Sequence, residues 1–226
     1  MPARSKMAAK RVFIVDDHPM MRSGLAQLID NEPDLKVAGE AGTAAEALDA
    51  ILARPPDLVL LDISLPDKNG LELIKDLRAL KPGLPVLVIS MHDEAIYAER
   101  VLRAGGRGYL MKQEGGKKFL QAIRRVLEGR IYLSETMSER ILETFSGQAT
   151  KPTASPVHQL TDREFEVFQL LGQGKATREI ARQLHLSVKT VEVHRANIKK
   201  KLGLASAMAL VRYAVRWTET EKPGGQ

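Results

Sequence analysis

The chain has 226 residues, and its apolar share of 44% is typical of a globular protein that buries one large core or two small ones. The absence of cysteine excludes disulfides and thiolate metal sites. No apolar run approaches the roughly 20 residues of a membrane-spanning helix. The basic start "MPARSKMAAK" also lacks the apolar stretch of a secretory signal, so we expect a cytoplasmic protein with no membrane partner.

The net charge of +6 comes entirely from the last third of the chain. Residues 1–147 carry 21 Lys and Arg against 21 Asp and Glu, whereas residues 148–226 carry 13 against 7. This asymmetry indicates either a neutral module joined to one that meets a polyanion, or a chance imbalance on a solvated surface.

Short apolar runs alternate with helical periodicity up to residue 133, after a basic tail (1–9) that we expect to be disordered. The strand-like runs are 12–15, 35–41, 58–62, 85–90 and 108–112, and a helical pattern follows each of them. Several of these runs are apolar on both faces, as strands of a covered parallel sheet are. The pattern predicts a five-stranded, doubly wound, flavodoxin-like α/β domain over 10–133.

The pattern changes after residue 133. One more amphipathic helix is predicted over 134–145, and the Pro-, Gly- and Ser-containing stretch 146–158 lacks periodicity, so 134–159 is interpreted as a helix and a flexible linker. The next part, 160–217, shows only helical patterns, at 161–171, 177–184, 188–202 and 205–217. The sequence therefore predicts an all-α domain of four helices, followed by a disordered tail over 218–226.

Charged and hydroxyl side chains stand where the predicted strands end: Asp16 and Asp17, then Asp62, Ser90 and Lys112. The carboxyl ends of parallel strands meet at one edge of the sheet, where ligands bind. Three carboxylates so close together repel one another unless a cation joins them, and a hard dication such as Mg²⁺ prefers these oxygen ligands. Beside such a metal, Asp62 is expected to be open to an incoming group and to act as a nucleophile toward phosphorus.

These residues belong to motifs that resemble the receiver domain of two-component response regulators. The motifs are "VDDHP", "LLDISLPDKNG", "VLVISMHDE" and "GYLMK", in the same order as in that family. The resemblance implies that Asp62 is the phosphoacceptor and that Ser90 and Lys112 bind the phosphoryl group. It implies that Tyr109 is an aromatic switch that moves inward. It also implies a Mg²⁺ site in which Asp17, Asp62 and the backbone carbonyl of Ser64 bind the ion directly and Asp16 acts through water. The neighbouring histidines, His18 and His92, are expected to lie at the rim of the site and not to be ligands.

The C-terminal helices 177–184 and 188–202 are joined by a short turn, and the second has a basic face. This is helix-turn-helix geometry, in preference to a surface helix of a bundle. The motifs "LTDRE", "EIARQL", "TVEVH" and "KKKLG" resemble the LuxR-type DNA-binding domain, so the whole chain resembles a NarL/FixJ-type response regulator. The stretch "ATREIA" stands where "SNKEIA" is usual, so Ala176 offers no hydroxyl to cap its helix.

The predicted recognition helix supplies the expected DNA contacts. Its start should read bases, and Arg195, Lys199, Lys200 and Lys201 should contact phosphates. Glu192 either accepts from a cytosine amine or pairs with Arg195 or Lys189. The full set of predicted DNA-binding residues is Thr177, Lys189, Thr190, Glu192, Val193, His194, Arg195, Ala196, Lys199 and Lys200. The last helix carries Met208, Val211 and Val215, which form either a dimer surface or core packing.

The resemblance implies a regulator controlled by a sensor histidine kinase, which binds double-stranded DNA and dimerises when phosphorylated or DNA-bound. It implies no enzyme activity beyond self-phosphotransfer and autodephosphorylation. Two alternatives stay open at this point. One is a constitutive DNA binder whose receiver is only a dimer or docking platform. The other is a Mg²⁺-dependent phosphohydrolase, for which Ser64 and Asp67 are the nearest acid/base candidates.

Overall fold

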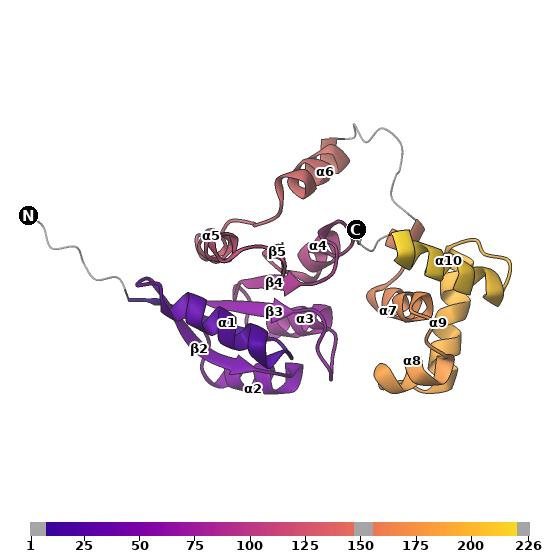
Figure 1. The fold of residues 1–226 in the computed structure, drawn as a ribbon, viewed down its shortest axis with the longest axis horizontal. Coiled ribbons are helices and arrows are strands. Elements are labelled where there is room, and N and C mark those ends of the chain that lie inside the picture. The colour runs from indigo at the N-terminus through magenta and orange to yellow at the C-terminus, as the bar shows by residue number, and fades with distance from the viewer. Residues whose placement is uncertain (1–7, 147–155, 221–226) are drawn as a thin grey trace, which may run out of the picture. The chain divides into compact units, whose positions relative to one another are not determined.

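The computed structural model describes residues 8–146 and 156–220, and it divides into two compact units, Met1–Gly147 and Gln148–Gln226 (Figure 1). Most of the predicted N-terminal tail (1–9), the linker (146–158) and the C-terminal tail (218–226) lies outside the described residues. None of the described helices is long and apolar enough to cross a membrane.

The first unit is a parallel sheet with strand order β2-β1-β3-β4-β5, which confirms the doubly wound prediction. Its strands are β1 (Lys10–Val15), β2 (Leu35–Ala41), β3 (Leu58–Asp62), β4 (Val86–Ser90) and β5 (Gly108–Met111). Its helices are α1 (Pro19–Asp30), α2 (Ala44–Ala53), α3 (Gly70–Leu80), α4 (Glu94–Ala104), α5 (Gly116–Leu127) and α6 (Glu135–Ser146).

Both faces of this sheet are buried. On one face, Ile14, Leu60 and Ile89 pack with residues of α1 and α5 in a single hydrophobic cluster. The residues that alternate with them along the strands, such as Leu61 and Val88, are buried as well. This is why the strands read as continuous apolar runs and why the polar residues at their ends stand out in the sequence.

Side-chain caps place the loops at the carboxyl edge of the sheet. Asn69 accepts from the backbone N–H of Leu71 at 2.7 Å to start α3, and Asp93 accepts from Ala95 at 2.7 Å to start α4. Gly105, with φ of 111°, ends α4 in the left-handed conformation that glycine adopts most easily. These short caps let each helix begin within a few residues of the polar strand ends.

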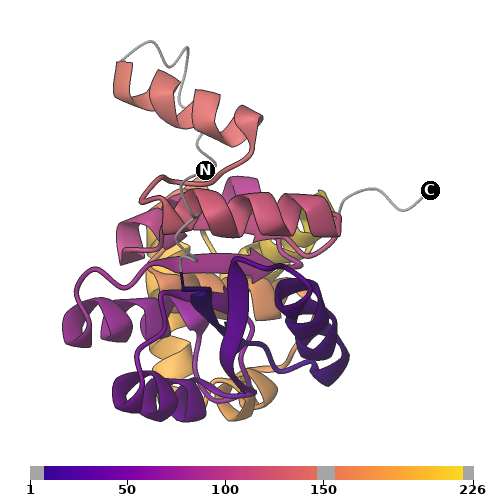
Figure 2. The ribbon, with the colours of Figure 1, turned by 90° about the vertical axis from the view of Figure 1, so that its left-hand side faces the viewer.

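The segment between α5 and α6 is attached to the edge strand β5. The backbone N–H of Tyr109 donates to the carbonyl oxygen of Tyr132 at 2.9 Å, and the N–H of Tyr132 donates to Arg107 at 3.0 Å. The N–H of Ser134 then donates to Glu94, in the first turn of α4, at 2.8 Å. Helix α6 follows and lies beyond α4 and α5, away from the sheet (Figures 1 and 2).

The second unit contains the four predicted helices, α7 (Asp162–Gly172), α8 (Thr177–Gln183), α9 (Val188–Lys201) and α10 (Ala207–Thr220), preceded by a 3₁₀ turn at Pro156–Gln159. Most helix ends lie within two residues of the prediction, and two differences cross a predicted segment boundary. The 3₁₀ turn occupies residues assigned to the linker, and α10 extends over 218–220, which were assigned to the tail. Trp217 packs edge-on against Phe165 and Phe168, with ring centroids 5.5 and 5.4 Å apart, and this packing holds α10 on α7.

Candidate functional site

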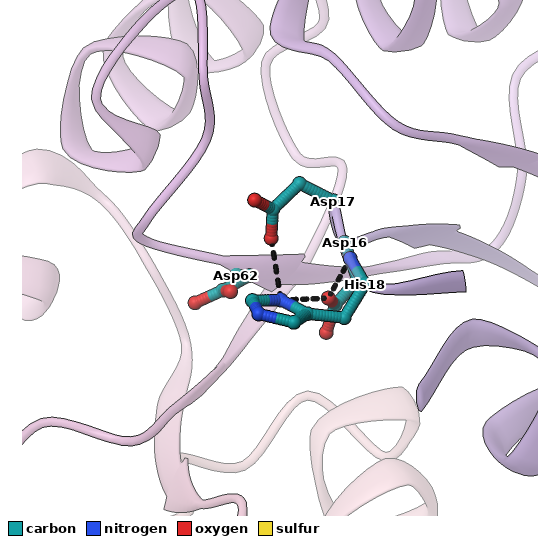
Figure 3. Close-up of side chains that lie close together, drawn as sticks. All are labelled: Asp16, Asp17, His18 and Asp62. Atoms are coloured by element: carbon teal, nitrogen blue, oxygen red, sulfur yellow. Dashed lines mark hydrogen bonds and ion pairs between the residues drawn. The ribbon is translucent and has the colours of Figure 1, made fainter. Parts of the chain in front are cut away.

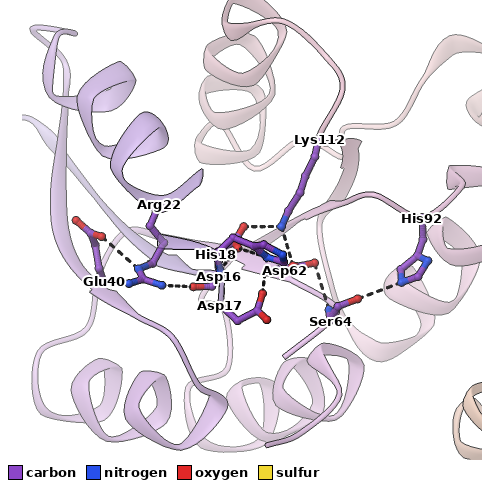
Figure 4. Close-up of polar contacts among 9 residues, drawn as sticks. All are labelled: Asp16, Asp17, His18, Arg22, Glu40, Asp62, Ser64, His92 and Lys112. Carbon is purple, nitrogen blue, oxygen red and sulfur yellow. Dashed lines mark hydrogen bonds and ion pairs between the residues drawn. The ribbon is translucent and has the colours of Figure 1, made fainter. Parts of the chain in front are cut away.

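The polar residues at the strand ends converge on one buried cluster, as expected. Asp16 and Asp62 are 0% and 2% exposed, and the Lys112 Nζ atom lies 2.7 Å from a carboxylate oxygen of each (Figure 4). The prediction that Asp62 stands open was therefore wrong for this state. Lys112 reaches across from beyond β5, and the loop after β3 folds back so that the N–H of Ser64 donates to Asp62 at 3.2 Å.

The charge balance of this cluster is negative. Burial raises the pKa of Asp62 above its ordinary value, although the hydrogen bond and charge of Lys112 oppose the shift. Burial also disfavours the Lys112 ammonium, but its hydrogen bonds to Asp16 and Asp62 outweigh this effect and raise the Lys112 pKa. Lys112 therefore stays protonated, and its single ammonium pairs with Asp16 and Asp62, while Asp17 adds a third carboxyl group to the cluster.

This donor set fits a divalent cation. Asp16, Asp17, His18 and Asp62 each offer one ligand atom, and these atoms all lie within 4.8 Å of one another (Figure 3). The Oδ1 atom of Asp17 is buried, and no described residue donates it a well-formed hydrogen bond, although His18 Nδ1 lies 2.6 Å away. A buried carboxylate oxygen in this condition gains from a cation, and oxygen ligands suit Mg²⁺.

The predicted switch residues form a connected network beside Asp62. Ser90 is fully buried, and its hydroxyl accepts from the N–H of His92 at 3.2 Å. Tyr109 is 1% exposed, and its hydroxyl donates to the His92 carbonyl at 2.7 Å, so the ring already lies inside the unit. Burial raises the pKa of Tyr109, which keeps the phenol protonated and able to donate.

Sequence reasoning missed three contacts near this network. The Ser64 hydroxyl and His92 Nε2 lie 3.0 Å apart, and the His92 ring stacks on Tyr97 with centroids 4.9 Å apart. Asp67 accepts from the N–H groups of Ala44 and Ala45 at 2.9 and 3.0 Å, so it caps α2 from the loop after β3. Because Asp67 is engaged in this cap, it is a poor acid/base for a phosphohydrolase.

In the second unit, α8 and α9 form the predicted helix-turn-helix. The turn places His185 at φ of 53°, and Ser187 caps α9 by accepting from the N–H of Thr190 at 3.0 Å. Ala176 supplies no side-chain cap to α8, as expected, and only Glu179 compensates by accepting from the N–H of Ala176 at 2.7 Å.

The exposed face of α9 carries most, but not all, of the predicted DNA contacts. Lys189, Glu192, Val193, Ala196 and Lys200 are exposed, and Thr190 and Lys199 are half-buried. The remaining predicted contacts, Thr177, His194 and Arg195, are half-buried.

Three side chains that were expected at DNA, those of His194, Arg195 and Lys201, interact with other residues of the unit. The Nδ1 atom of His194 is buried, and burial lowers its pKa. Arg195 donates to the Thr177 hydroxyl and pairs with Glu192 at 3.1 Å, which is one of the two roles considered for Glu192. Lys201, expected at a phosphate, lies 2.6 Å from the buried carboxylate of Glu164.

The predicted dimer residues lie on one side of α10. Met208 is 67% exposed and Val211 and Val215 are half-buried, whereas Leu210 and Ala214 point into the unit and are buried. The helix therefore has an inner face that forms the core and an outer apolar stripe formed by Met208, Val211 and Val215.

Comparison with known proteins defines the class. Residues 12–124 match the model of the response regulator receiver domain, and residues 158–214 match the model of bacterial regulatory proteins of the luxR family. The chain therefore belongs to the response regulators that join a receiver to a LuxR-type helix-turn-helix, which confirms the NarL/FixJ-type resemblance.

Individual relatives match the chain over nearly their whole lengths. The chain is 34% identical over 210 residues to the oxygen regulatory protein NreC of Staphylococcus aureus, covering 91% of this chain and 97% of NreC. It is 40% identical over 199 residues to the transcriptional regulatory protein UhpA of Salmonella typhimurium, covering 88% and 94%. A solved structure of RcsB from Salmonella enterica serovar Typhimurium, bound to promoter P1flhDC with the phosphomimetic BeF3−, has 25% identity and a TM-score of 0.65, covering 92% and 98%.

Proposed function

We propose that this response regulator is switched by transfer of a phosphoryl group from a sensor histidine kinase to Asp62, and that the switch controls DNA binding by α9. The observation that carries the proposal is the position of Asp62 at the end of β3, held at 2.7 Å by Lys112 beside Asp16. A carboxylate oxygen of Asp62 attacks phosphorus, the P–N bond to the kinase histidine breaks, and the imidazole leaves with the bond electrons.

The chain's own residues have distinct parts in this transfer. Asp16, Asp17, Asp62 and the Ser64 carbonyl would hold Mg²⁺, which when bound neutralises charge on the phosphoryl oxygens. Lys112 moves from the carboxylate of Asp62 to a phosphoryl oxygen, as a point charge. Self-phosphotransfer and the slow loss of phosphate to water are the only reactions assigned, and the proposal places them in the cytoplasm.

The signal leaves the pocket through Ser90 and His92. When the Ser90 hydroxyl turns to donate to the phosphoryl group, it releases the backbone N–H of His92. The backbone carbonyl of His92 already accepts a hydrogen bond from the Tyr109 hydroxyl. Tyr109 therefore retains an inward position in the switched state and does not enter from outside. Tyr132 and Ser134 hydrogen-bond to β5 and α4, so movement of these elements reaches α6 directly.

DNA binding follows from the exposed face of α9. Its first turns would lie in the major groove, and Lys189, Lys199 and Lys200 would contact phosphates. Two copies would pair through the stripe of Met208, Val211 and Val215 on α10. Phosphorylation would bias this pairing by a coupling of about 1–3 kcal/mol, or roughly 5–150-fold in DNA affinity.

A titration of promoter DNA with the full chain tests the proposal, with and without prior incubation with acetyl phosphate and Mg²⁺. Intact-mass spectrometry runs alongside, and Asp62→Asn is the control. We expect one phosphoryl adduct and tighter DNA binding in the parent, and neither change in Asp62→Asn. Equal DNA affinity of phosphorylated and unphosphorylated parent would support constitutive binding and refute the switch.

A further inference from the structure

The His18 side chain is 67% exposed, as expected of a residue at the rim, and its imidazole nevertheless contacts the acidic cluster. Its Nδ1 atom is 2.6 Å from Asp17 Oδ1 and 3.3 Å from Asp16 Oδ1 (Figure 3). The residue is the N-cap of α1, yet its side chain makes no capping hydrogen bond to that helix. The imidazole is therefore turned back toward the carboxylates and is not engaged with the backbone of α1.

The two other cations near the cluster, Lys112 and Arg22, contact atoms other than Asp17 Oδ1. Lys112 approaches Asp16 and Asp62 through their Oδ2 atoms. Arg22 donates to the backbone carbonyl of Asp16 at 2.6 Å and pairs with Glu40 at 3.5 Å, so it does not reach the carboxylates (Figure 4). An ion that binds Asp17 Oδ1 would thus have the His18 nitrogen beside it.

The spacing of the four ligand atoms suits a single ion after small shifts. Ligands on opposite sides of an ion with bonds of about 2.1 Å are about 4.2 Å apart. The ligand atoms of Asp16, Asp17, His18 and Asp62 lie within 4.8 Å of one another, which is close to the distance across such an ion. His18 is well placed to move, because its side chain is 67% exposed.

We propose that His18 is a nitrogen ligand of this metal site, so that loss of His18 weakens the binding of first-row transition ions such as Mn²⁺ more than the binding of Mg²⁺. Mg²⁺ takes oxygen ligands almost exclusively, whereas imidazole nitrogen adds affinity along the transition series. This inference rests on the metal site of the proposed function and extends it to the choice of ion.

Pulsed electron paramagnetic resonance of bound Mn²⁺ tests the inference, because it detects couplings to a ligated imidazole nitrogen. The probe is Mn²⁺ alone with the full chain, and the variants are His18→Gln and His92→Gln. His92 is the matched control, since it lies beside the pocket but outside the group of ligand atoms. Circular dichroism verifies that each variant is folded.

We expect nitrogen couplings in the parent and in His92→Gln, and their loss in His18→Gln. The Mn²⁺ affinity of His18→Gln should fall by about tenfold, a loss typical of removing a group that positions a metal. Its Mg²⁺ affinity, measured by competition, should change little. Mn²⁺ bound without nitrogen couplings in the parent, or couplings lost only in His92→Gln, would overturn the role of His18 and leave the metal site standing. Failure of both ions to bind would overturn the metal site itself.

Discussion

Replacement of Glu164 by alanine is expected to destabilise the C-terminal unit by about 2–3 kcal/mol. Glu164 is 4% exposed, and its Oε2 atom accepts from the N–H of Thr161 at 2.8 Å and from Lys201 Nζ at 2.6 Å. Loss of the capping contact costs about 1 kcal/mol. A hydrogen bond between charged groups contributes about 1.5–3 kcal/mol, reduced here because the Lys201 side chain is 35% exposed.

Trp217 makes this prediction measurable in the full chain. It is the only tryptophan, and it packs on Phe165 and Phe168 of α7, so its fluorescence reports unfolding of this unit alone. In urea titrations, Glu164→Gln should cost about 1 kcal/mol, because the amide oxygen still accepts from Thr161 but has lost its charge. Lys201→Met should cost a similar amount, whereas Lys200→Met, at an exposed neighbour, should cost almost nothing.

The effect of pH gives an independent check. Burial would raise the pKa of Glu164, but the hydrogen bonds from Lys201 and Thr161 outweigh it and hold the pKa below its ordinary value of 4.5. The carboxylate therefore contributes its full stability above about pH 4.5 and loses it as the pH falls through the lowered pKa. The difference between the parent and Glu164→Gln should close on acidification. Equal losses of unfolding free energy in Lys200→Met and Lys201→Met would refute the reasoning. So would a stability difference between the parent and Glu164→Gln that does not depend on pH.

Three further predictions concern single positions. A methyl group at residue 70 would lie 2.6 Å from the Asp62 carbonyl oxygen, so Gly70→Ala should cost about 1–3 kcal/mol in denaturant and slow phosphorylation, measured by intact mass. His185→Gly should stabilise the second unit by about 0.5–1 kcal/mol by relieving the φ of 53°, and an unchanged Trp217 unfolding midpoint would contradict this. Burial raises the pKa of Asp62 above 3.8, so the protonated carboxyl favours the folded state, and this contribution is lost as the pH rises through the raised pKa. Asp62→Asn should therefore raise the melting temperature in chelator by about 2–4 °C, and a lower value by circular dichroism would count against it.

The sheet and the acidic pocket could be predicted because their signals are local. Each strand is a short apolar run, and the polar residue that ends it stands at the carboxyl edge in any doubly wound order. The capping of α2 by Asp67 could not be predicted in this way, because it joins two loops 22 residues apart that meet only after the sheet has formed. The burial of Asp62 likewise depends on the reach of Lys112 from another strand.

The half-buried position of His194 could have been predicted from helical periodicity, which the basic charge of the neighbouring residues obscured. Val191 and Ile198 are the buried stripe of α9, and His194 lies three residues after the first and four before the second. This spacing places all three on one face of a helix. His194 is accordingly half-buried with its Nδ1 inside the unit. The basic character of the surrounding residues favoured a DNA contact, but helical periodicity decides the direction of the side chain.

The cations of the recognition helix consequently divide into two groups. Arg195 and Lys201 are paired with Glu192 and Glu164, so they position the helix. A cation already paired gains less from a phosphate, because the protein partner must be given up. Under the proposed function, the charge that attracts DNA would therefore come chiefly from lysines near the two ends of α9. Between those ends the exposed side chains of Val193 and Ala196 are apolar, which suits contact with thymine methyl groups in the major groove more than hydrogen bonds to guanine.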